Sequence, residues 1–166
     1  YNSAESHLNL GALYREVGNI NEAKKEILLA LEINPDIKDG YLNLSCIHQD
    51  LQEIELAYKF IQKALKKKES CSKTYLNAAN ILQCKGDNKL AKELLIKSIK
   101  INNREYRAYF LLSLFKEDKL LNELESDFLN FKEESIDSEI SKIDFLFAKS
   151  NIYHKRKNYF LASKYL

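Results

Sequence analysis

An eight-residue pattern returns at a fixed interval along this chain. HLNLGALY at residues 7–14 comes back as YLNLSCIH at 41–48 and as YLNAANIL at 75–82, each copy 34 residues after the one before. A period of roughly 20 to 50 residues is typical of solenoids built from repeated structural units. One such unit cannot bury its apolar face alone, so neighbouring units must stack and share a continuous core.

Each unit is predicted to be a pair of antiparallel α-helices. Apolar residues recur at helical spacing within every copy, and the chain has only four glycines and one proline, which favours long helices with short turns. Units are expected at 4–37, 38–71 and 72–105, with a degenerate fourth at 106–142 and a partial fifth at 143–166. The expected helices are 4–17, 20–33, 38–50, 54–67, 72–85, 88–101, 106–117, 120–134, 138–155 and 158 onward. We expect residues 1–166 to form one array and the parent protein to continue beyond Leu166.

The first unit resembles the tetratricopeptide repeat (TPR), whose pattern is aromatic-x2-Leu-Gly-x2-Tyr, then Ala-x3-Phe and Pro. The matching residues are His7, Leu10, Gly11, Tyr14, Ala23, Ile27, Ala30 and Pro35. Later units place Ser45 and Ala79 at the glycine position, and the fourth departs from the pattern with Glu125 where a small alanine is usual. The resemblance implies an all-α, right-handed superhelix of antiparallel helix pairs. Gly11, Ser45 and Ala79 should face Ala23, Ala57 and Ala91, so that the two helices of each pair approach closely.

An asparagine stands third in all three copies, at Asn9, Asn43 and Asn77. The array resembles that of nucleocytoplasmic O-linked N-acetylglucosamine transferases, which carry an asparagine ladder at this position of the concave groove. An asparagine amide can pair with both polar groups of a peptide backbone. We therefore expect a protein-interaction scaffold that binds an extended peptide or a partner protein in the groove. The other candidate groove residues are Asn80, Leu8, Arg15, Leu42, Gln49, Leu76 and Gln83. The open alternative is that these asparagines are solvated consensus residues or cap neighbouring turns.

No pattern indicates catalysis, a metal or another cofactor. Cys46 and His48 stand two residues apart on a predicted helix and point to different faces, and no set of ligands has metal-site spacing. The basic stretches 66–68 and 154–157 occur in a chain of net charge +2, so no nucleic-acid partner is expected. Apolar runs such as 109–115 are too short to cross a membrane. The three cysteines lack redox spacing and favour a reducing, cytoplasmic location, and the many Lys, Asn and Ile residues suggest a bacterial genome.

Two further hypotheses concern the second half of the chain. Residues 147–166 resemble the segment that joins repeat arrays to sulfotransferase-type domains in some bacteria. On that alternative the array is the non-catalytic, substrate-recruiting region of a larger transferase, whose catalytic domain lies outside this chain. The degenerate fourth and fifth repeats could instead mediate formation of a homo-oligomer.

Overall fold

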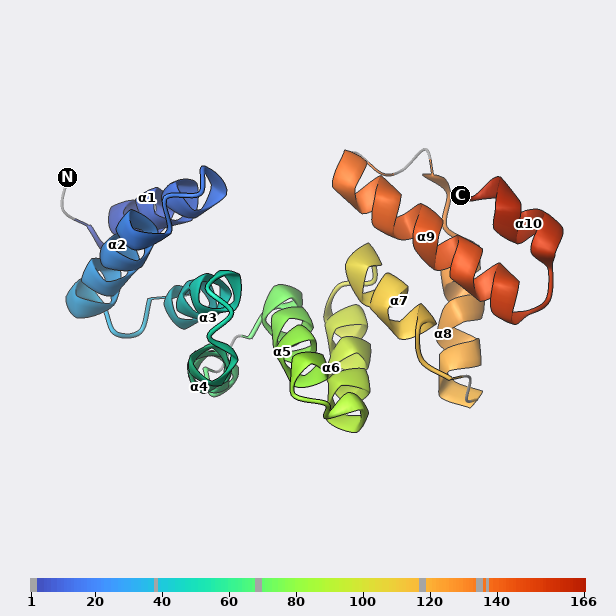
Figure 1. Ribbon diagram of the computed structural model, residues 1–166, viewed down its shortest axis with the longest axis horizontal. Helices are drawn as coiled ribbons and strands as arrows, with labels where there is room; N and C mark the ends of the chain where they lie inside the picture. Colours follow the sequence, from blue (N-terminus) through green and yellow to red (C-terminus); the bar gives the residue numbers. More distant parts are fainter. Residues whose placement is uncertain (1–2, 38, 68–69, 117–118, 134–135, 137) are drawn as a thin grey trace. The chain divides into compact units, whose positions relative to one another are not determined.

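The computed structural model describes residues 3–37, 39–67, 70–116, 119–133, 136 and 138–166. Within these ranges the regular structure consists of ten α-helices joined by short turns (Figure 1). They are α1 (Ala4–Glu16), α2 (Ile20–Ile33), α3 (Gly40–Asp50), α4 (Ile54–Leu65), α5 (Ser72–Cys84), α6 (Asn88–Ile101), α7 (Tyr106–Ser113), α8 (Lys119–Leu129), α9 (Glu139–Lys155) and α10 (Tyr159–Lys164). The predicted all-α fold is confirmed.

Two helices, α7 and α8, end at least four residues earlier than the sequence predicted. Helix α7 ends at Ser113 because Leu114 and Phe115 donate to the carbonyl groups of Leu111 and Leu112, a tighter turn than the α-helix. Helix α8 likewise ends in a tight turn, in which residue 131 donates to the carbonyl of residue 128. The expected end points 117 and 134 lie outside the described residues. The bounds of α2 and α6 agree with the prediction.

One type of turn follows α1, α3, α5 and α9. Its left-handed residue is Gly18, Gln52, Gly86 or Lys157, with φ of 83°, 60°, 82° and 58°. In each case the next residue donates its N–H to a carbonyl five residues earlier, as in Asn19 to Tyr14 at 2.8 Å. This is a common way to end a helix, and glycine is favoured there because it lacks a Cβ. Two of the four turns thus keep the geometry without the glycine.

The chain divides into two compact units, Tyr1–Asn88 and Lys89–Leu166. In the first unit α1 pairs with α2 and α3 with α4, while α2 packs on α3 and α4 on α5. The first helices of successive hairpins also touch, α1 beside α3 and α3 beside α5. Ala23 and Ile27 of α2 and Leu44 and Ile47 of α3 form a core cluster between the first two hairpins. The repeats of this unit therefore stack as the period predicts.

Small residues let the two helices of the first hairpin, and those of the second, approach closely. A Cβ placed on Gly11 would lie 2.5 Å from Ile27 Cγ1 and 3.1 Å from the Ala23 carbonyl oxygen. In the second hairpin, Ser45 Oγ donates to the carbonyl oxygen of Ala57 at 3.0 Å. These two contacts confirm the predicted small-residue facing. The third predicted pair, Ala79 and Ala91, falls in different units.

In the second unit α9 packs against both α7 and α10, and α7 also contacts α8. Aromatic rings fill this core: Tyr109 stacks on Phe128 at a centroid distance of 4.4 Å, and Phe128 meets Phe145 at 5.3 Å. Ser150 Oγ donates to the carbonyl oxygen of Ala162 at 2.9 Å, across the same twelve-residue separation as Ser45 and Ala57. The α9–α10 hairpin therefore reproduces a contact of the first unit.

Candidate functional site

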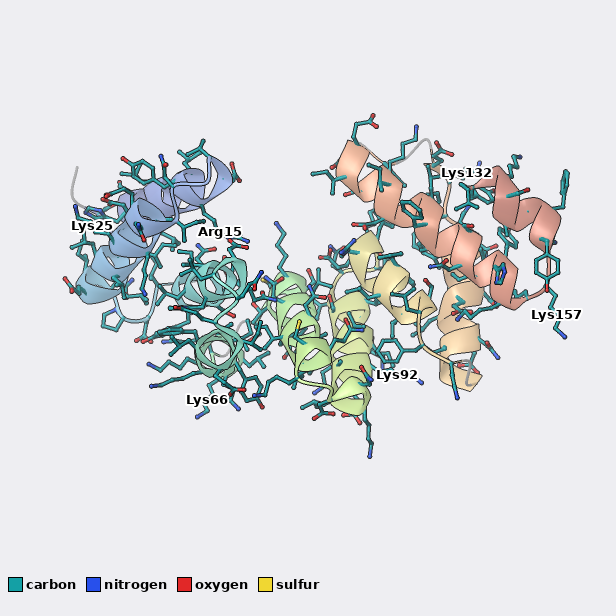
Figure 2. The ribbon with its side chains drawn as sticks, in the orientation of Figure 1. Arg15, Lys25, Lys66, Lys92, Lys132 and Lys157 are labelled. Atoms are coloured by element: carbon teal, nitrogen blue, oxygen red, sulfur yellow. The ribbon has the colours of Figure 1, made fainter. Side chains whose placement is uncertain are left out.

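The first helices α1, α3 and α5 form a row in the first unit, and two side-chain links join them. Arg15, which is labelled in Figure 2, lies on α1 and donates to Asp50 on α3 through both Nε and Nη2, at 2.6 and 3.2 Å. Asn77 Nδ2 on α5 donates to Cys46 Sγ on α3 at 3.2 Å. Each link spans about one repeat of the sequence, so equivalent positions of successive repeats lie on neighbouring helices.

The predicted polar groove residues reach the surface of this row. Asn9 is exposed, and the half-buried ones are Arg15, Asn43, Gln49, Asn77, Asn80 and Gln83. Asn77 already uses its Nδ2 group on Cys46, which leaves its carbonyl oxygen as an acceptor. This hydrogen bond to Cys46 gives Asn77 a structural role that is neither solvation nor the capping of a turn.

The three predicted leucines require a correction. Leu42 and Leu76 are only 6% and 8% exposed, and Leu8 packs against two core clusters. Leu42 and Leu76 are core residues, and Leu8 is half-buried against the core, so all three side chains pack within the fold. The sequence pattern placed them on the groove side of their own helix, but it did not show that a neighbouring helix covers that side.

The charge of Arg15 stabilises the contact between α1 and α3, and it does not activate the Cys46 thiol as a nucleophile. The hydrogen bond that Arg15 donates to Asp50 raises the pKa of Arg15, which stays charged. Burial raises the pKa of the Cys46 thiol, and the nearby Arg15 charge lowers it by less. A thiol with a raised pKa is a poor nucleophile at neutral pH. His48 is 2% exposed, stacks on Phe60 at 5.1 Å and contacts Glu53 Oε2 through Nδ1 at 2.5 Å. Both residues are thus used in packing.

The two basic stretches are also used within the fold. Lys67 pairs with Asp36 and lies 5.7 Å from the centroid of the Tyr41 ring, whereas Lys68 lies outside the described residues. In the second unit Lys155 pairs with the buried Glu125, and Arg156 Nη2 donates to Ser126 Oγ at 3.0 Å. The stretch 154–157 therefore fastens α9 to α8.

The described residues contain no cluster of three or more His, Cys, Asp or Glu residues placed to hold a metal ion. None of their helices combines the length and apolar character that crossing a membrane requires.

Sequence reasoning missed an apolar surface in the second unit. Ile140, Ile143 and Phe147 of α9 are all exposed, and their spacing of three and four residues places them on one helical face. That spacing was the available signal. It was overlooked because the fourth and fifth repeats match the pattern only loosely.

Comparison with known proteins identifies the repeat. The tetratricopeptide repeat family model matches residues 4–37, 39–70 and 72–105. No curated protein matches the chain. Similar solved structures include YrrB, described as a TPR protein with an unusual peptide-binding site (18% identity, TM-score 0.67, 99% of this chain and 83% of that chain). MamA (21% identity, TM-score 0.63, 94% and 82%) and a TPR protein of Parabacteroides merdae (16% identity, TM-score 0.64, 98% and 63%) are also similar. At these identities the likeness concerns the fold.

Proposed function

Because the chain belongs to the tetratricopeptide repeat family, we propose that it is a protein-interaction scaffold whose ligand lies along α1, α3 and α5. Proteins of this fold typically act as interaction scaffolds, and YrrB, a similar structure, is described as having a peptide-binding site. The ligand is an extended peptide or an extended segment of a partner protein. The hypotheses of transferase recruitment and of a homo-oligomer through the fourth and fifth repeats stay predictions.

The observation that carries this proposal is the row of accessible amides on adjacent first helices. Asn9 is exposed and Asn43 half-buried, one repeat apart on α1 and α3, which contact each other. Packed helices lie roughly 8–10 Å apart, and an extended chain advances about 3.3 Å per residue. Each asparagine therefore meets about every third ligand residue, and the carbonyl oxygen of Asn77 can accept from the next peptide N–H.

The binding free energy available from hydrogen bonds separates the role of the asparagines from that of the other groove residues. Four net hydrogen bonds from Asn9 and Asn43, at about 0.5–1.5 kcal/mol each, contribute about 2–6 kcal/mol. A millimolar complex corresponds to about 4 kcal/mol. The asparagines therefore hold a backbone in register but do not select a sequence. Selection falls to the flanking side chains, among them Gln49 and Gln83.

The test uses peptides selected from a random display library on the wild-type chain. Their affinity is then measured by fluorescence anisotropy for wild type and for Asn9→Ala/Asn43→Ala, which we expect to bind at least tenfold more weakly. A matched control, Asn21→Ala/Gln62→Ala, removes two exposed amides from α2 and α4 and should bind like wild type. Equal affinity of the groove variant and wild type, with unchanged thermal unfolding, would refute the proposed site.

A further inference from the structure

An exposed apolar surface lies on α7 and α9 of the second unit. Ile140, Ile143 and Phe147 of α9 contribute to it and are 75%, 52% and 45% exposed. The other two members are Phe110 of α7, which is half-buried, and Leu114, which directly follows α7 and is 60% exposed. The Phe110 and Phe147 rings lie 6.0 Å apart and join the two helices. We refer to these five residues as the α7–α9 surface.

This surface is additional to the core of the unit. Other faces of the same two helices are already buried, through Tyr109 and Leu112 of α7 and Phe145, Ala148 and Ile152 of α9. At the repeat position of Phe147, the second and third repeats place Leu42 and Leu76, which are 6% and 8% exposed. The fifth repeat thus keeps a larger apolar side chain at this position and leaves it in solvent. Contiguous exposed apolar side chains of this kind mark interaction sites.

Charge at the margin of the surface favours an acidic neighbour. Arg107 Nη1 donates to Asp144 Oδ1 at 2.8 Å, and its guanidinium lies 5.0 Å from the centroid of the Phe110 ring. The Arg107 side chain remains 49% exposed, whereas that of Asp144 is 11% exposed. A guanidinium has five N–H donors in a planar fork. The cation is therefore the member of the pair that a partner carboxylate can reach.

The size of the surface decides between possible occupants. Taking roughly 150–250 Å² for each large side chain when free, the exposed parts of these five amount to roughly 350–700 Å². A stable dimer buries about 800 Å² on each partner, which two copies of this surface alone do not reach. Ile140 to Phe147 spans about 10 Å along α9, which matches two turns of a single helix. A short segment fits this surface better than a second copy of the chain.

We propose that the α7–α9 surface docks an amphipathic helical segment of a partner protein, with apolar residues at i, i+4 and i+7 and an acidic residue beside Arg107. The apolar face of the segment covers Ile143 and Phe147, and its carboxylate pairs with the exposed side of the guanidinium. This docking uses α7 and α9 alone. It does not depend on the peptide site proposed for α1, α3 and α5.

The probe is a synthetic, helix-stapled 14-residue peptide with leucines at i, i+4 and i+7 and one glutamate a turn before the first leucine. Binding to the full chain is followed by fluorescence anisotropy. We expect saturable binding to wild type and at least tenfold weaker binding to Ile143→Ser/Phe147→Ser. A probe in which lysine replaces the glutamate should bind wild type more weakly than the original probe. The control Leu28→Ser/Leu56→Ser removes two similarly exposed leucines from α2 and α4 and should bind the probe like wild type.

Three results would overturn the proposal: no binding of the probe to wild type, equal losses in the two double variants, or no preference for glutamate over lysine. A fourth contradicting result would come from sedimentation velocity of the chain without the probe. If the mass of wild type rises with concentration while Ile143→Ser/Phe147→Ser stays a monomer, the surface binds a second copy of the chain. Asn9→Ala/Asn43→Ala should bind the probe like wild type. A failure of the site proposed for the first unit can therefore be distinguished from a failure of the α7–α9 surface.

Discussion

Replacement of Gly11 by alanine tests the close approach of α1 to α2. The added Cβ would lie 2.5 Å from Ile27 Cγ1, 3.1 Å from the Ala23 carbonyl oxygen and 3.2 Å from Ile27 Cδ1. Ile27 is fully buried, and its Cγ1 atom is bonded directly to Cβ. This atom cannot swing away as the end of a long side chain would. Either the rotamer of Ile27 or the spacing of the two helices must change.

Two opposing terms set the magnitude. Alanine in a helix interior is more favourable than glycine by about 0.5–1 kcal/mol, whereas overpacking a well-filled core costs about 1–3 kcal/mol. A contact of 2.5 Å is far inside van der Waals distance, so the steric term is expected to win. Gly11→Ala should therefore lower the free energy of unfolding, by up to about 2.5 kcal/mol.

The assay is urea unfolding followed by far-ultraviolet circular dichroism, for a double-mutant cycle of Gly11→Ala and Ile27→Ala. Ile27→Ala alone is expected to cost about 2–5 kcal/mol. In the double variant the new Cβ enters space vacated by Cγ1, so the combined loss should be smaller than the sum by at least about 0.5 kcal/mol. Ala12→Gly, on the same helix, measures the propensity term separately. A stabilising Gly11→Ala or an additive cycle would refute the close-contact argument.

Two further predictions concern the second unit. Glu125→Ala should destabilise the chain by about 3 kcal/mol because it leaves Lys155 without its partner in a largely buried ion pair. The double variant Glu125→Ala/Lys155→Met should recover most of that loss, because it removes the unpaired charge as well. Urea unfolding of both variants measures this, and a double variant as unstable as the single one would contradict it. Burial raises the pKa of Tyr109 to about 12 from its ordinary value of 10, so its stabilising effect is complete below pH 10 and is lost as pH rises through 12. Between pH 8 and 11 wild type should therefore lose about 1.4 kcal/mol more than Tyr109→Phe, and parallel losses in denaturant titrations at the two pH values would contradict this.

The positions of the helices followed from the sequence because the signals for them are local. The 34-residue period and the spacing of apolar residues set the bounds of α2 and α6 as observed. Gly18 and Gly86 directly follow the expected helix ends at 17 and 85, and glycine is the residue favoured in such a turn. The same turn at Gln52 and Lys157 had no such signal, because there the surrounding helices hold a left-handed residue that the side chain itself disfavours.

The candidate site was predictable only in part. An exposed Asn9 and a half-buried Asn43 agree with the sequence pattern, which defines the faces of one helix relative to each other. The pattern does not say which neighbour covers a face. Leu42 and Leu76 were therefore assigned to the ligand although they belong to the core.

Two residues that depart from the repeat pattern or belong to no motif show what the sequence alone could not predict. Glu125 occupies a position where the repeat has a small alanine, and Lys155 belongs to a basic stretch thirty residues further along. Nothing in the sequence pattern links the two residues, yet in the folded chain Glu125 and Lys155 form an ion pair between α8 and α9. Periodicity along the chain determined that hairpins form and stack. Which charges meet was decided by the tertiary structure, because an ion pair depends on the distance between atoms of different helices and not on their spacing in sequence.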